Sequence, residues 1–182
     1  MKAFSSTIQG VILFEPKVFR DSRGYLFESF NQKYFEKTIG LSPRFVQENH
    51  SQSTKGVLRG MHYQLPPKAQ GKLIRVIQGE IFDAVVDIRK NSPTIGHWFG
   101  EILSAENKKQ LWIPPGFAHG FLTLSKTAEI LYKATDFYAP ENERCLAWND
   151  PDIVIEWPLQ GQPFLSEKDK NGVSLLDVEL FT

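Results

Sequence analysis

Short apolar runs rich in Val and Ile recur along most of the chain, and their length predicts β-strands in preference to helices. Two of them, 72–78 and 81–88, are separated by Gly79 and Glu80 alone, a spacing that is compatible with a β-hairpin. Further strands are predicted at 10–14, 97–103, 110–113, 120–124 and 129–133. Gly and Pro separate many of these runs, so the pattern favours an all-β sandwich or barrel.

One helix is predicted near the start of the chain. Asn31 can cap it, Tyr34, Phe35 and Ile39 form its apolar side, and Gly40 can end it. The tail, 160–182, mixes charges with Leu and Val, which indicates short helical or irregular structure. Neither an internal repeat nor a linker is visible, so we expect residues 1–182 to form a single domain.

Composition and charge narrow the class of protein. Apolar residues make up 41% and charged residues 23% of the 182 residues, which is typical of a globular protein. The 21 basic and 21 acidic side chains cancel, so nothing favours non-specific binding to nucleic acid or to a membrane. Cys145 is the only cysteine, and no apolar stretch approaches the roughly 18 residues of a membrane span. We therefore expect a cytoplasmic protein.

The four histidines lack the spacing that is typical of metal ligands. His50, His62, His97 and His119 show no pair at i, i+2 or i, i+4, and no Cys-x-x-Cys is present. A site assembled from scattered ligands stays open as an alternative, but the spacing predicts no metal.

The segment 58–64 brings a cation, a glycine and a base close together. In a regular strand Gly60 and His62 would share a face and Arg59 would lie on the other. Arg59 and His62 can reach one ligand only if the strand bulges or twists at Gly60. Taken alone, a strand histidine is more often a hydrogen-bonded structural residue than a catalyst.

Other candidate residues have two interpretations each. Lys72 opens a strand, so it is either a solvated strand end or the cation beside an oxyanion. Asp83 is either a surface charge or a buried carboxylate that needs a partner. Tyr132 is either a half-buried strand aromatic or a general acid. His119 follows a rigid Pro-Pro-Gly turn, and its role stays open at this stage.

Seven segments taken together resemble the dTDP-4-dehydrorhamnose 3,5-epimerase family. They occur in the family's order and continue into Lys168-Asp169; the segments are 19–24, 47–51, 58–64, 72–76, 79–83, 112–121 and 138–143. The resemblance implies a cupin-like double-stranded β jelly roll with a few short helices, usually as a homodimer. It also implies inversion of C3 and C5 of dTDP-4-dehydro-6-deoxy-D-glucose in dTDP-L-rhamnose biosynthesis, without metal or cofactor.

The resemblance assigns roles to four candidate catalytic residues. His62 resembles the family's base, and Asp169 its partner. Lys72 resembles the cation that stabilises the enolate oxygen, and Tyr132 the acid that protonates from the opposite face. Both C3 and C5 lie beside the C4 ketone, so each C–H can be lost to form an enolate.

The substrate-binding positions implied by the resemblance need multiple donors for a diphosphate and an aromatic for the base. Tyr138 resembles the aromatic that stacks on thymine. The full set is Arg23, Glu28, Gln47, Glu48, Asn49, Arg59, His119, Tyr138, Glu143 and Lys168. In the family, the segment that carries Arg23 and Glu28 can contribute to the site of a neighbouring subunit.

Three alternatives are weighed against the double epimerase. One is an epimerase that acts at one carbon, or on another dTDP-4-keto sugar. Another is a metal-dependent cupin such as a dioxygenase, which predicts stoichiometric metal. The last is a non-catalytic nucleotide-sugar binding module, which would have no use for His62, Asp169 and Tyr132 as an acid–base set.

Overall fold

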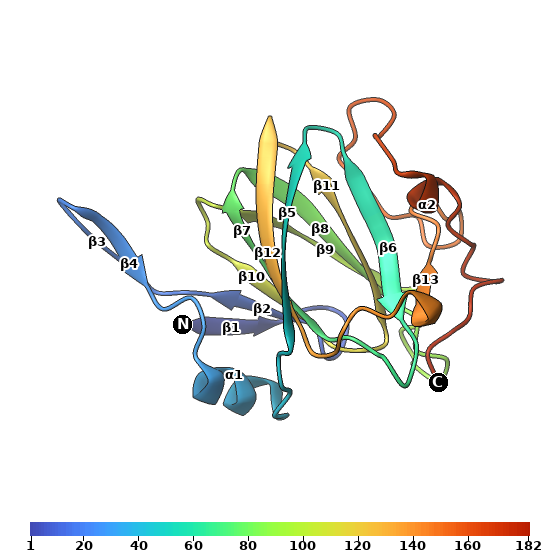
Figure 1. Ribbon diagram of the computed structural model, residues 1–182, viewed down its shortest axis with the longest axis horizontal. Helices are drawn as coiled ribbons and strands as arrows, with labels where there is room; N and C mark the ends of the chain where they lie inside the picture. Colours follow the sequence, from blue (N-terminus) through green and yellow to red (C-terminus); the bar gives the residue numbers. More distant parts are fainter.

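Two antiparallel β-sheets face each other in the computed structural model, which describes residues 1–182 (Figure 1). The six-stranded sheet has the order β1 (Lys2–Ser5), β2 (Ile12–Glu15), β10 (Gln110–Ile113), β7 (Lys72–Gln78), β12 (Thr127–Ala134), β5 (Gln47–Thr54). The five-stranded sheet has the order β13 (Glu143–Cys145), β6 (Leu58–Gln64), β11 (Phe117–Thr123), β8 (Glu80–Asp87), β9 (Trp98–Ser104). The all-β, cupin-like jelly-roll prediction is confirmed.

The predicted hairpin of residues 72–78 and 81–88 is wrong. β7 lies in the six-stranded sheet and β8 in the five-stranded one, so the two strands do not pair. Gly79 has φ +75°, and a Cβ there would lie 2.1 Å from the carbonyl oxygen of Thr127. The chain therefore crosses between the sheets at Gly79 instead of folding back within one sheet.

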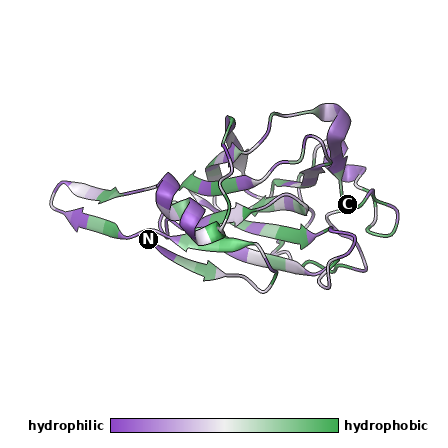
Figure 2. Ribbon diagram, turned by 90° about the horizontal axis from the view of Figure 1, so that it is seen from below, coloured by the Kyte–Doolittle hydropathy of each residue, from purple (hydrophilic) through white to green (hydrophobic).

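Apolar side chains from both sheets fill the space between them. Ile74, Val85 and Ile130 belong to this buried cluster. A second cluster covers the outer face of the five-stranded sheet, where the C-terminal segment packs through residues such as Ile153. Both faces of β11 are consequently buried, whereas apolar and polar positions alternate along other strands (Figure 2).

The predicted helix is confirmed as α1 (Gln32–Ile39). The Asn31 side chain accepts a hydrogen bond from the Tyr34 backbone N–H at 3.0 Å, and Gly40 ends the helix with φ +72°. Phe35 packs edge-on against Trp112, with 5.1 Å between the ring centroids. This contact fixes α1 against the six-stranded sheet.

Further short elements follow or project from the two sheets. The strands β3 (Val18–Asp21) and β4 (Gly24–Phe27) form a hairpin that projects away from the two sheets (Figure 1). A 3₁₀ turn, η1 (Pro140–Asn142), precedes β13, and α2 (Glu167–Lys170) lies within the otherwise irregular tail, as expected for 160–182. No helix is long and apolar enough to cross a membrane.

Candidate active site

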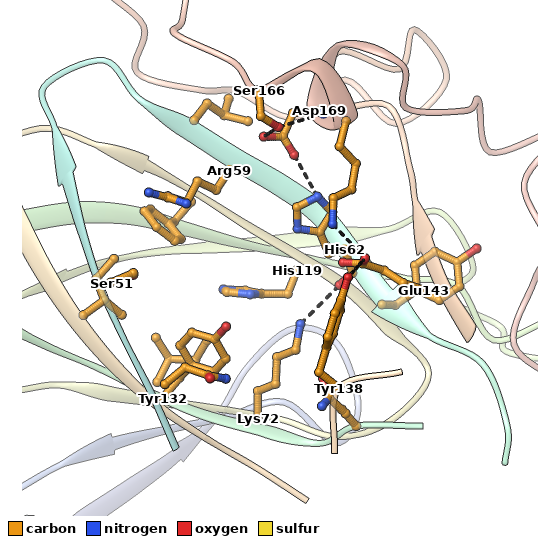
Figure 3. A pocket seen from close by; sticks show the side chains of 18 of the residues that line it. Ser51, Arg59, His62, Lys72, His119, Tyr132, Tyr138, Glu143, Ser166 and Asp169 are labelled. Atoms are coloured by element: carbon orange, nitrogen blue, oxygen red, sulfur yellow. Dashed lines mark hydrogen bonds and ion pairs between the residues drawn. The ribbon is translucent and has the colours of Figure 1, made fainter. Parts of the chain in front are cut away.

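A cavity of about 630 Å³ opens between the two sheets (Figure 3). Its size lies within the range that accommodates small ligands. β5, β7 and β12 supply one side, β6, β11 and β13 supply the other, and α2 closes one end. The cavity includes all four candidate catalytic residues and most of the candidate binding residues.

His62 and Asp169 form a histidine–carboxylate pair at one side of the cavity. Nε2 of His62 lies 2.7 Å from Oδ1 of Asp169, although this nitrogen is not aligned for a regular hydrogen bond. The Asp169 carboxylate also accepts from Ser166 Oγ at 2.6 Å and from the Gly60 N–H at 3.2 Å. Burial opposes ionisation, but these contacts hold the pKa of Asp169 at about 2. Asp169 is therefore a fixed negative charge next to His62.

β6 has an irregularity at Gly60, which is the condition under which Arg59 and His62 could reach one ligand. Gly60 has φ +132°, and a Cβ there would lie 2.4 Å from the Cα of Gly120. The pairing of β6 with β11 shifts register between His119 and Phe121, next to this close approach. Arg59 and His62 both line the cavity as a result.

His119 forms a second histidine–carboxylate pair, deeper in the protein. Its Nε2 lies 3.0 and 3.1 Å from the two carboxylate oxygens of Asp83, which is fully buried. Asp83 is thus the buried carboxylate that the strand pattern allowed, and His119 is its partner. Burial lowers the pKa of His119 while Asp83 opposes this shift, so the ring is neutral and donates from Nε2.

Lys72 extends into the same cavity from the start of β7. Its Nζ donates to the carbonyl oxygen of His62 at 3.4 Å. Burial lowers the pKa of Lys72 to about 8, with Glu143 and Asp83 opposing the shift. The ammonium remains the main form at neutral pH, and the Lys72 side chain points toward the two histidines in Figure 3.

Tyr132 reaches the cavity from the sheet opposite His62. It lies directly across from Asn49 in the β12–β5 ladder, and both side chains line the cavity. Burial raises the pKa of Tyr132, so the phenol keeps its proton at neutral pH. Tyr132 on β12 and His62 on β6 therefore line the cavity from different sheets.

Several polar residues that line the cavity are joined by hydrogen bonds. Glu143 Oε2 accepts from Lys168 Nζ at 2.7 Å and from the Tyr138 hydroxyl at 2.8 Å. The Tyr138 backbone N–H donates to Gln47 Oε1 at 2.9 Å, and the ring is 52% exposed. This exposed ring is positioned to stack on a flat ligand group.

The Arg59 end of the cavity adds residues that sequence reasoning missed. Arg59 Nε donates to Ser53 Oγ at 3.0 Å, which fixes the guanidinium at the cavity wall. Ser51 Oγ is buried at the cavity without a hydrogen-bond partner. The period of two along β5 places Ser51 and Ser53 on the face of Gln47, and this was the available signal.

Comparison with known proteins identifies the family. The sequence profile of dTDP-4-dehydrorhamnose 3,5-epimerase matches residues 5–177. The chain belongs to this epimerase family. The epimerase of Pseudomonas aeruginosa is 60% identical over all of this chain and 99% of its own length.

Solved structures of epimerases agree with this assignment. The Legionella pneumophila enzyme, in complex with dTDP-4-keto-L-rhamnose, is 49% identical with a TM-score of 0.94, over 98% of this chain and 94% of that one. A 3′-monoepimerase from Streptomyces bikiniensis, in complex with dTDP-quinovose, is 34% identical with a TM-score of 0.89. The match covers 94% of this chain and 86% of the Streptomyces chain.

Three predicted binding residues lie outside the cavity of this epimerase chain. Glu48 points away from it and pairs with Lys133 at 2.9 Å, because it lies on the opposite face of β5 from Gln47. Arg23 lies at the tip of the β3–β4 hairpin, and Glu28 follows that hairpin. Within one protomer, the structure does not bring these residues together with His62.

Three side chains that can donate to a metal meet at the wall of the epimerase cavity, where two of them, His62 and Asp169, line it. A His62 nitrogen, the Cys145 sulfur and an Asp169 oxygen lie within 4.8 Å of one another. Burial raises the pKa of Cys145 to about 12, so the free thiol is neutral. The sequence spacing did not reveal this cluster, because its members come from three different elements.

Proposed function

We propose that the chain epimerises dTDP-4-dehydro-6-deoxy-D-glucose at C3 and C5 to give dTDP-4-dehydro-L-rhamnose. The observation that carries the proposal is the placement of His62 and Tyr132 on opposite sheets around one cavity. Inversion at carbon requires proton removal on one face and proton delivery on the other. Family membership and the sugar nucleotide held by the Legionella relative support this substrate.

The proposed reaction proceeds through an enolate at each carbon in turn. His62 takes the proton from the C–H bond beside the C4 ketone, and the bonding electrons move to the ketone oxygen. The Asp169 carboxylate stabilises the imidazolium that forms, and the Lys72 ammonium stabilises the enolate oxygen. Tyr132 then gives its proton to carbon from the opposite face, and exchange with solvent restores both residues.

The remaining polar residues are proposed to bind the nucleotide and the sugar. Arg59 and Lys168 offer donors to the diphosphate or sugar, and Tyr138 offers its exposed ring to thymine. The neutral His119 already donates its one N–H to Asp83, so its other ring nitrogen can only accept, as from a sugar hydroxyl. Gln47, Asn49 and Glu143 line the same cavity and complete the binding set in this chain.

We also propose a cytoplasmic homodimer in which Arg23 and Glu28 act at the partner's site. Both residues lie away from the cavity of their own chain, and the projecting β3–β4 hairpin that precedes Glu28 and carries Arg23 is shaped to reach another subunit (Figure 1).

A second candidate function is epimerisation at one carbon. The similarity to the Streptomyces 3′-monoepimerase favours keeping it, because that protein shares the fold at 34% identity. The two functions use the same acid–base chemistry and differ in how the sugar sits between His62 and Tyr132.

Proton NMR of the 4-keto sugar nucleotide with the protein in deuterium oxide tests the proposal. Deuterium is expected at both C3 and C5, and coupling to a 4-keto reductase is expected to give the L-rhamnose nucleotide. Deuterium at one carbon would establish the monoepimerase instead. No exchange, together with tight dTDP binding, would indicate a binding module.

A further inference from the structure

Cys145 lies beside the proposed catalytic base, although the proposed reaction does not use a thiol. β13 pairs with β6 so that Cys145 is directly opposite His62 in the ladder. α2 brings Asp169 to the same point, and one donor atom from each of the three residues lies within 4.8 Å of the others (Figure 3 shows His62 and Asp169).

We propose that these three residues form an inhibitory site for a soft divalent metal ion such as Zn²⁺ or Cd²⁺. Imidazole nitrogen, thiolate sulfur and carboxylate oxygen are the donors that Zn²⁺ uses in proteins. Three protein ligands leave a fourth position for water, and two of the three, His62 and Asp169, line the cavity. The ion is an inhibitor in this proposal and takes no part in the epimerisation.

The surroundings of the donors orient them for an ion. Ser166 Oγ donates to Asp169 Oδ2 at 2.6 Å and the Gly60 N–H donates to Oδ1 at 3.2 Å, so the carboxylate is held in place. His62 Nε2 is buried without an aligned hydrogen bond, although Asp169 Oδ1 lies 2.7 Å away. An ion inserted at this contact would satisfy both atoms after a small separation of the pair.

The charges near the site balance such an ion. Binding would form a metal–sulfur bond and release the thiol proton to solvent, leaving a thiolate and a carboxylate to neutralise the two positive charges. The nearby Lys168 ammonium opposes binding, but Glu143 pairs with it at 2.7 Å. Mg²⁺ prefers oxygen ligands in octahedral geometry and is not expected to compete.

Metal occupancy would block proton abstraction. An ion on Nε2 of His62 would replace the Asp169 contact that stabilises the imidazolium, and its charge would lower the basicity of the other ring nitrogen, which takes the proton in the proposed function. This consequence rests on the proposed function, whereas binding of the ion does not. The two can therefore be tested separately.

Metal binding can be tested without substrate. The protein is titrated with Cd²⁺, and the ultraviolet absorption of the cadmium–thiolate bond is monitored. Cys145 is the only cysteine, so the band can arise from no other residue. The band is expected in the wild type and absent in Cys145→Ser, with Cd²⁺ affinity weakened at least about tenfold by calorimetry. His50→Gln removes the exposed His50–Glu129 pair as a matched control and is expected to bind like the wild type.

The absence of the cadmium–thiolate band in the folded wild type would overturn the proposal. So would equal Cd²⁺ affinity in the wild type and Cys145→Ser, since the ion would then bind elsewhere. Thermal unfolding of each variant checks that the comparison is made between folded proteins.

The inhibition step is tested by solvent-deuterium exchange with Zn²⁺. Wild-type exchange is expected to fall with Zn²⁺ and to return on chelation, while Cys145→Ser is expected to need at least about tenfold more Zn²⁺ for the same inhibition. Equal inhibition of both proteins would overturn the assignment of Cys145. A cadmium band in a protein that shows no exchange at all would refute the epimerase function and leave the metal site standing.

Discussion

Lys72 is the residue whose protonation should limit activity at alkaline pH. Burial lowers its pKa from the ordinary value of 10.5 to about 8, so the ammonium is lost as the pH rises through about 8. Because the neutral amine cannot stabilise an enolate electrostatically, kcat is expected to fall above that pH. Rate measurements across the pH range in saturating substrate check this expectation.

Two variants test whether Lys72 causes the fall in kcat at alkaline pH, the alkaline limb of the pH profile. Lys72→Arg keeps a positive charge across the range, so any residual activity should lose this limb. Lys72→Met removes the charge at every pH and should lower kcat throughout. An unchanged alkaline limb in Lys72→Arg would assign the titration to another group.

Tyr132 should separate proton removal from inversion. Tyr132→Phe removes the acid on β12 but leaves His62 and Asp169 on the other side of the cavity. Epimerisation is therefore expected to fall by about 10²–10⁴-fold, with a smaller loss of deuterium exchange. Tyr34→Phe, on α1 and away from the cavity, is the matched control. Equal losses of the two rates would exclude Tyr132 as a separate acid.

The sequence could predict individual candidates at the residue scale, but not their contacts. Asp83 and His119 are 36 residues apart, and they meet because β8 and β11 pair in a register that local patterns do not determine. The bulge at Gly60 could be stated from the sequence only as a condition, namely the one under which Arg59 and His62 reach one ligand. Glu48 lies on the wrong face of β5 for the cavity, which the motif alone did not reveal.

At the scale of elements, burial explains which strands the sequence revealed. The strands at 72–78 and 110–113 have apolar runs because they bury side chains. β5, with the sequence Gln-Glu-Asn-His-Ser-Gln-Ser-Thr, is polar on both faces because one face lines the cavity and the other is largely exposed. A search for apolar runs cannot find such a strand.

Asp87 stabilises the end of β8 through its charge. It is fully buried, and Arg89, Ser92 and Thr94 donate to its carboxylate at 2.6–2.9 Å. Burial opposes ionisation, but these donors lower the pKa of Asp87 to about 2. This native pKa lies below the unfolded value of about 3.9, so ionisation of Asp87 stabilises the folded state above about pH 4. That stabilisation is lost as the pH falls toward 2.

Asp87→Asn should therefore destabilise the protein in a pH-dependent way. The free energy of unfolding in urea is expected to fall by about 2 kcal/mol at pH 7, with a smaller difference from the wild type at pH 3. Asp152→Asn, at an exposed position, is the matched control and should change little. If Asp87→Asn lowered the free energy of unfolding equally at both pH values, the charge of Asp87 would not be the source of the stabilisation.

At the scale of the whole molecule, the β3–β4 hairpin projects from the two sheets and leaves large apolar side chains exposed (Figure 1). Phe19, Tyr25 and Leu26 are 56%, 54% and 74% exposed on it, an apolar surface that favours contact with another protein. Arg23 lies at the tip of the same hairpin, away from the cavity of its own chain. A second copy of the chain would cover the apolar side chains and receive Arg23 at its site.

Mixing two inactive variants decides whether Arg23 acts across the dimer. Arg23→Ala and His62→Ala homodimers should each be nearly inactive, because every site lacks one residue. If Arg23 serves the partner's site, each mixed dimer contains one site with both wild-type residues. Random mixing after refolding together should then restore about a quarter of the wild-type activity per subunit. If Arg23 served its own chain, every site in the mixture would lack a residue, and no activity would return.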